Sequence, residues 1–311
     1  MKQRFVFQFF IAIALFVAAT GCVALKEYKK AQNAFNLGAS LEMKQRTASS
    51  ANDLPASPDL EILFPTTGQP DMSLKPASYY QNAYDQVTKA LKVSGKLKSS
   101  DVLGEALAIK ALAAWKLKKY EEAREAAKVA GAELEIEPDA GARDKALMAA
   151  MGGLIAIDLA HDSISKMNKI LLDAAQKPEN VTKEQATALY EQAKMHFEQF
   201  VFSRQISRNS LWQGIQTIDE AKMKAEPTHD IQRYLLMAQL SGLKNWTDAL
   251  NAIDTAAKRL GVKSSNNAAK GWIEDQKSFY RTTRDGYLGK LAGLIPGGKN
   301  APVYLSWEKI L

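Results

Sequence analysis

Few residues in this chain have the types and spacing that a catalytic site needs. Ser163 and Lys166 stand three positions apart, a spacing in which a lysine can activate a serine nucleophile. The same spacing recurs at 241–244 and 306–309, and the K-T-G and S-D-N motifs that would accompany such a nucleophile are missing. G-x-S-x-G and H-E-x-x-H are missing too. We therefore expect a protein that is not an enzyme.

Metal ligation is poorly supported as well. His161, His196 and His229 are scattered, and none stands four positions from another histidine. One acidic cluster contains Glu133, Glu135, Glu137 and Asp139. It lacks the central glycine of a calcium loop and lies beside Pro138, so we interpret it as a solvated turn at a helix end. We expect no metal and no other cofactor.

Cys22 is the one residue whose surroundings indicate a modification, and it is the only cysteine. Residues 1–21 begin with positive charges at Lys2 and Arg4, continue with an apolar run over 5–19, and end in small residues. This order is typical of a secretory signal, and the run is short for a transmembrane helix. Ala-Thr-Gly-Cys resembles the lipobox of bacterial lipoproteins, which implies that diacylglycerol is attached to Cys22 and that residues 1–21 are removed. An ordinary cleavable signal and an uncleaved anchor are the alternatives.

The resemblance also implies a location. Val23 follows the cysteine, where an aspartate would resemble the inner-membrane retention signal, so we expect the outer membrane, facing the periplasm. The formal net charge of +7 could suggest nucleic acid. Basic groups such as Lys116, Lys118 and Lys119 lie beside acidic residues, however, so we interpret them as solvated helix faces and expect no nucleic-acid partner.

The rest of the chain divides into four parts. Residues 22–46 have apolar positions at helical spacing, which predicts a helix directly after the lipid anchor. Residues 47–77 hold half of the ten prolines and predict a long loop. Residues 78–293 are helical in pattern almost throughout, and 294–311 form a tail that breaks at Pro296-Gly297-Gly298 and folds back as a cap.

Five segments share one pattern, in which an aromatic residue is followed by alanine, an apolar residue and a small or apolar residue at offsets of three, four and three. They are Tyr28-Ala31-Phe35-Gly38, Tyr80-Ala83-Val87-Ala90, Tyr120-Ala123-Ala127-Ala130, Tyr190-Ala193-Phe197-Phe200 and Trp246-Ala249-Ile253-Ala256. These offsets put the four residues on one helix face, where alanine lets a neighbouring helix approach closely.

Residues 104–131 and 230–261 each add a preceding helix and a short turn to this pattern, and they resemble the tetratricopeptide repeat, a helical hairpin that stacks into a superhelix. The resemblance implies an all-α solenoid of stacked hairpins with irregular insertions, because the five patterns are unevenly spaced. Among the insertions, residues 145–160 are apolar on nearly every side and predict a buried helix, with Asp162 or Ser163 capping the next one. Thr182 and Gln185 form a capping box, and 206–225 and 266–293 predict further helices.

The function that this resemblance implies is a membrane-anchored scaffold or adaptor that binds an envelope protein or peptide in a groove. The first helix of each hairpin lines such a groove in the family, which indicates Glu105, Leu112, Trp115, Lys116, Ile231 and Tyr234. For Trp115, burial against the adjacent hairpin is the open alternative. The alternative function is a periplasmic carrier or transporter-associated subunit that binds a small apolar ligand between helices, along Met148 to Leu172.

Overall fold

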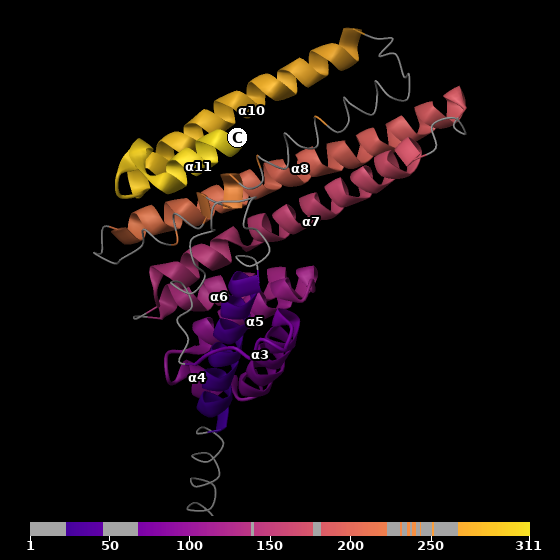
Figure 1. The fold of residues 1–311 in the computed structure, drawn as a ribbon. Helices are drawn as coiled ribbons and strands as arrows, with labels where there is room; N and C mark the ends of the chain where they lie inside the picture. The colour runs from indigo at the N-terminus through magenta and orange to yellow at the C-terminus, as the bar shows by residue number, and fades with distance from the viewer. Residues whose placement is uncertain are drawn as a thin grey trace, which may run out of the picture. The chain divides into compact units, whose positions relative to one another are not determined.

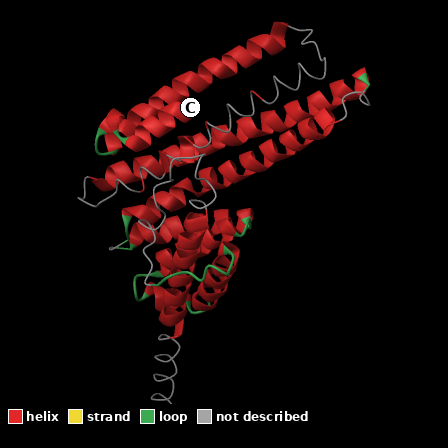
Figure 2. Cartoon of the chain, in the orientation of Figure 1, coloured by secondary structure: helices red, strands yellow, loops and turns green. Residues whose placement is uncertain are grey.

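The computed structural model describes residues 23–45, 68–137, 140–176, 182–222 and 267–311, together with positions 231, 235–236, 238–240, 243 and 251. Across these residues the regular structure is helical and contains no strand (Figure 2), so the all-α prediction is confirmed. The chain forms two compact units. The first comprises Met1–Ala51, Asp59–Met151 and Gln216–Thr228, and the second comprises Asn52–Pro58, Gly152–Ile215 and His229–Leu311.

The first unit begins with a pair of helices, residues 23–45 and α3 (Pro76–Leu91), shown in indigo and purple in Figure 1. Proline at the first position of α3 suits a helix start, because its missing N–H would have no partner there. The apolar positions predicted for both helices are buried: Tyr28, Ala31, Ala34, Phe35, Tyr80, Ala83, Val87 and Ala90. A β-carbon added at Gly38 would lie 2.9 Å from the Tyr80 ring, so the glycine permits the close approach of the two helices.

A second pair follows, α5 (Leu103–Lys116) and α6 (Tyr120–Ile136), after the short helix α4 (Ser94–Lys98). The predicted hairpin over 104–131 is confirmed, with a three-residue turn. In this turn the N–H of Lys119 donates to the carbonyl of Ala114 and the N–H of Lys118 to that of Trp115, both at 2.9 Å. These two bonds close the end of α5 as a Schellman motif, in which Lys118 has the left-handed φ of 61°.

The two pairs are stacked with their first helices parallel. The Tyr28 hydroxyl donates to Glu105 near the start of α5, and Glu42 pairs with Lys116 at its end. Helix 23–45 and α5 therefore run in the same direction along the chain. Tyr80 near the start of α3 reaches Glu42, so α3 runs antiparallel to both.

The helix α7 (Ala142–Gln176) contains the apolar segment predicted to be buried. Between 145 and 160 every residue is buried or half-buried, which confirms that prediction. The part Ala142–Ile170 is long and apolar enough to cross a membrane by length and composition, and 56% of its apolar window is buried inside the protein. The predicted cap at Asp162 or Ser163 is wrong. The helix continues through both, and the Ser163 hydroxyl donates to the Leu159 carbonyl within the same helix at 3.0 Å.

The helix α8 (Lys183–Lys222) begins with the predicted capping box. The N–H of Gln185 donates to the Thr182 hydroxyl at 3.2 Å, and the N–H of Thr182 donates to the Gln185 side chain at 2.9 Å. A separate helix over 206–225 is wrong, because residues 206–222 continue α8. A β-carbon at Gly152 would lie 3.2 Å from the Ser210 hydroxyl, so this glycine lets α7 and α8 approach closely.

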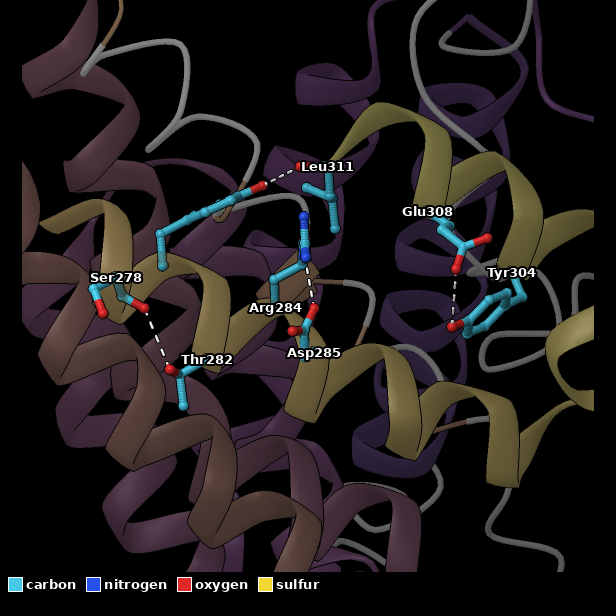
Figure 3. A network of polar contacts seen from close by, with 8 residues as sticks. Ser278, Thr282, Arg284, Asp285, Tyr304, Glu308 and Leu311 are labelled. Atoms are coloured by element: carbon cyan, nitrogen blue, oxygen red, sulfur yellow. Dashed lines mark hydrogen bonds and ion pairs between the residues drawn. The ribbon is translucent and has the colours of Figure 1, made fainter. Parts of the chain in front are cut away.

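The second unit ends in α10 (Asn267–Leu294), the short helix η2 (Gly298–Asn300) and α11 (Pro302–Ile310). The break lies at the predicted glycines, with φ of 87° at Gly297 and 56° at Gly298. The tail then folds back on α10, where Tyr280 donates to the carbonyl of Leu311 at 2.7 Å (Figure 3). Trp307 of α11 is buried. The tail therefore lies against α10, and the predicted cap on the hairpin over 230–261 falls largely outside the described residues.

Candidate partner-binding surface

The helix predicted to line the groove of the first unit, α5, is buried on almost every side. Ten of its fourteen residues are buried, including alanines at 106, 108, 111, 113 and 114. Their small side chains let neighbouring helices approach α5 from several directions. Leu112 is 3% exposed and Trp115 is 7% exposed. The structure therefore places both in the core of the unit, as the burial alternative for Trp115 expected.

Glu105, another predicted groove residue, is half-buried and contacts the chain's own first helix. It accepts a hydrogen bond from the hydroxyl of Tyr28, a side chain that is itself buried. Burial raises the pKa of the Tyr28 hydroxyl above its usual range, and the Glu105 carboxylate raises it further. Tyr28 therefore stays a hydrogen-bond donor, and the contact is a packed interhelical link.

Lys116 forms the second link to the first helix. Its Nζ lies 2.9 Å from Oε2 of Glu42, and both side chains are largely buried. Tyr80 donates to the same carboxylate at 2.6 Å. The ammonium also lies 4.5 Å from the ring centre of Trp115 and 5.8 Å from that of Tyr80, within cation–π range. The cluster joins residues 23–45, α3 and α5.

A third cluster of the same kind joins α3, α5 and α6. The Tyr84 hydroxyl donates to Glu122 at 2.5 Å, and Lys110 lies 3.1 Å from the same carboxylate. Burial raises the pKa of Tyr84 to about 12, with Glu122 adding to the effect. The hydrogen bond from Tyr84 in turn holds the pKa of Glu122 below its ordinary value. Lys119 lies 3.7 Å from the centre of the Tyr84 ring.

The remaining predicted groove residues belong to the second unit. Ile231 is buried, together with Leu235, Leu236, Leu240 and Leu243. Tyr234 lies outside the described residues. The structure therefore brings Glu105, Leu112, Trp115 and Lys116 together along α5, where helix 23–45 covers Glu105 and Lys116, and it shows Ile231 in a core.

The exposed apolar side chains described in the first unit are Val23, Met72, Leu74, Val93, Val129 and Ile136, and the last two share the helix α6. Val129 is 48% exposed and Ile136 is 66% exposed. They stand seven residues apart, two turns along the same face of the helix. The periodic pattern Tyr120-Ala123-Ala127-Ala130 identifies the opposite, packed face of α6, so this outer face could have been found from the sequence.

The lipidation residue, Cys22, lies outside the described residues, but the residues that follow it do not. Val23 is exposed and Ala24 is 1% exposed, so the packed body begins within two residues of the cysteine. Helix 23–45 is then held by Tyr28 and Glu42 against the second hairpin. A group attached to Cys22 would have almost no tether.

Ser163 and Lys166, the motif residues that the structure describes on α7, form no site with each other. Ser163 donates its hydroxyl proton to a backbone carbonyl of α7, and Lys166 is an exposed residue of the same helix. Within the described residues, no three side chains of His, Cys, Asp or Glu gather as they would around a metal ion.

Sequence reasoning misjudged Glu137, which was interpreted as part of a solvated turn. Glu137 is 8% exposed, and its Oε1 accepts a hydrogen bond from the N–H of Gly104 at 2.6 Å. The carboxylate thus caps the start of α5 from the end of α6. A β-carbon at Gly104 would lie 2.7 Å from Oε2 of Glu137, so the glycine makes room for the cap. In the sequence, Gly104 at the start of the predicted helix was the one indication that another group approaches the backbone there.

Comparison with known proteins adds no identity: no protein-family model, no curated protein and no solved structure matches this chain.

Proposed function

We propose that this protein is a bacterial envelope lipoprotein, anchored through a lipid on Cys22, whose stacked helical hairpins bind another protein or peptide. The arrangement of helix 23–45, α3, α5 and α6 supports a tetratricopeptide-like pair of hairpins, because the first helices run parallel and each second helix runs antiparallel to its own first helix. Such hairpins act in binding and scaffolding, where shape and a few anchor residues determine affinity.

The observation that carries the proposal is that the packed unit begins two residues after Cys22, without a flexible linker between them. Ala24 is buried and Tyr28 is bonded to Glu105, so the helix that follows Cys22 is part of the packed unit. A carrier that shuttles between membranes gains nothing from a rigid link to one bilayer. A scaffold gains from a rigid link, because its binding surface is then held at a fixed height above the bilayer. The short link therefore favours the binding function.

The partner surface that fits the structure is the outer face of α6. The sequence placed it on α5, but Leu112 and Trp115 are buried there. Val129 and Ile136 are accessible apolar side chains on one helix face, and apolar side chains of this kind make the central contacts of interfaces.

Two measurements test the proposal. The first is metabolic palmitate labelling of the full chain and of Cys22→Ala: we expect label on the first and none on the second, and an unlabelled wild-type chain in the cytosol would contradict the anchor. The second is a photo-crosslinking amino acid at Ile136, with the exposed position Lys166 of α7 as control. We expect a discrete envelope protein crosslinked from Ile136 only. A small apolar molecule that co-purifies with the chain, without any protein crosslink, would favour the carrier.

A further inference from the structure

Exposed lysines gather at the end of the first unit where the chain leaves Cys22. We call this group the lysine edge, and its members are Lys26, Lys29, Lys30, Lys89, Lys92, Lys96 and Lys98. They come from three elements: the start of helix 23–45, the end of α3 and the short helix α4.

The packing of the first unit brings these three elements to one end. Helix 23–45 and α3 are antiparallel, because Tyr80 near the start of α3 reaches Glu42 near the end of the first helix. The end of α3 therefore lies beside the start of helix 23–45, and α4 follows α3 after two residues. Figure 1 shows the start of the indigo helix and α4 at the same end of this unit. The charge of Lys89 also acts on Glu27, where it adds to the hydrogen bond from Lys30 in lowering the pKa of that carboxyl.

The lysine edge keeps a positive charge after its acidic neighbours are counted. The Nζ of Lys30 lies 2.7 Å from Oε1 of Glu27, and the Nζ of Lys98 lies 3.1 Å from Oε2 of Glu133, so two lysines are paired. The five others are Lys26, Lys29, Lys89, Lys92 and Lys96. Besides Glu27 and Glu133, the exposed acidic residues on these elements and in the turn after α4 are Asp85 and Asp101, which are fewer than the five lysines.

Two apolar side chains stand among these lysines. Val23 is 56% exposed at the start of the first helix, and Val93 is 36% exposed between α3 and α4. A surface that combines lysines with accessible apolar side chains matches the interface of a bilayer, where the charges meet phosphates and the apolar groups enter the headgroup region.

We propose that the lysine edge binds the surface of an anionic phospholipid bilayer and so forms a second membrane contact beside the lipid anchor. The inference rests on the proposed anchor for its orientation, because Cys22 directly precedes Val23. An anchored chain with this contact holds its body against the membrane in one orientation. The outer face of α6 then faces a defined direction.

The size of the effect follows from surface electrostatics. Each lysine near an anionic surface strengthens binding by about fivefold, and the attraction falls off within a Debye length of about 10 Å at 0.1 M salt. Four such contributions multiply to about 600-fold, and a loss of about tenfold in binding to anionic vesicles already requires nearly two of them. The loss should disappear at high salt.

The test measures vesicle binding of the full chain in a Cys22→Ala background, which removes the acyl group from every variant. The probes are vesicles of phosphatidylcholine alone and vesicles that also contain phosphatidylglycerol, whose headgroup carries a negative charge. One variant replaces exposed lysines of the edge: Lys26→Gln, Lys29→Gln, Lys92→Gln and Lys96→Gln. The matched control replaces four exposed lysines of the second unit: Lys166→Gln, Lys169→Gln, Lys299→Gln and Lys309→Gln. The two variants have the same net charge.

We expect the preference for anionic vesicles to fall at least about tenfold in the edge variant and to stay unchanged in the control. Equal losses in both variants, or a preference that survives about 0.5 M salt, would overturn the inference. Circular dichroism of both variants checks that the helices remain. Palmitate labelling of Cys22 reports the anchor separately, so an unlabelled chain with intact anionic preference would reject the anchor and keep the lysine edge.

Discussion

The ammonium of Lys116 lies 2.9 Å from the Glu42 carboxylate, although the two residues are 74 positions apart. The pair joins the first helices of the two hairpins at the end remote from Cys22. Tyr80 donates to the same carboxylate, so each charge has a partner inside a largely buried cluster. Removal of either charge leaves the other without compensation, and this costs more than an exposed pair is worth.

We predict that Lys116→Met lowers the free energy of unfolding by about 1–3 kcal/mol, because the Glu42 carboxylate stays in a desolvated position. The measurement is urea unfolding followed by circular dichroism. The exposed pair Glu121–Arg124 provides the control, since Glu121 is 85% exposed in its side chain. Glu121→Gln should change stability by less than about 0.5 kcal/mol. Equal effects at the two sites would show that Lys116 and Glu42 are solvated in solution.

A substitution of Trp115 distinguishes a role in the core from a role in partner binding. Its side chain is 7% exposed, so Trp115→Ala should lower the free energy of unfolding by about 3–5 kcal/mol through lost contacts and a cavity. The groove interpretation expects instead that the variant keeps its stability and loses its partner. Val129→Ala, at a half-exposed position of α6, should change stability by less than about 0.5 kcal/mol. An unchanged urea midpoint for Trp115→Ala would contradict the core role and support the groove interpretation.

Helical periodicity predicted which faces of the first unit are packed, but it could not say what covers them. Tyr28, Ala31 and Phe35 are buried as their spacing predicts. On α5, Glu105 and Lys116 are polar residues, and the resemblance to the repeat family assigned them to a groove. They contact residues of helix 23–45 that are more than seventy positions earlier, and no local pattern reports such a contact.

Local capping rules were correct at Thr182 and wrong at Ser163. Both residues have the types that favour helix starts. Thr182 has Gln185 as a reciprocal partner, and the capping box forms. Ser163 instead bonds to the carbonyl of Leu159 inside a helix of 35 residues. A serine can satisfy its hydroxyl in either way, so the reciprocal partner is the better signal.

The turn between α5 and α6 offers a stabilising substitution. Lys118 has a φ of 61°, a conformation that strains a residue with a β-carbon and suits glycine. We predict that Lys118→Gly raises the free energy of unfolding by about 0.5–1 kcal/mol. Lys118→Ala is the control, because it removes the same side chain and keeps the β-carbon. Thermal unfolding of the three proteins decides, and a gain shared by glycine and alanine would mean that the lysine side chain, not the backbone, was the unfavourable element.

The buried cap at Glu137 predicts a dependence of stability on pH. Burial raises the pKa of this carboxyl above its ordinary value of 4.5, although the N–H groups at the start of α5 act in the opposite direction. A raised pKa means that the folded protein binds the proton more tightly than the unfolded chain does. The contribution of Glu137 to stability is therefore fully present below the ordinary pKa and is lost as the pH rises through the folded value.

Glu137→Gln supplies the reference for that measurement, because a glutamine can accept from the N–H of Gly104 and does not titrate. We predict that the stability of the wild-type protein falls relative to Glu137→Gln as the pH rises from below the ordinary pKa of 4.5 to above it, because the carboxyl ionises in its buried position. Urea midpoints of both proteins across this range give the difference directly. Because all other titrating groups are shared, a difference that stays constant with pH would show that the carboxyl is solvated when the protein is folded. A difference that rises with pH would mean that the helix start outweighs burial and that Glu137 is a charged cap of α5.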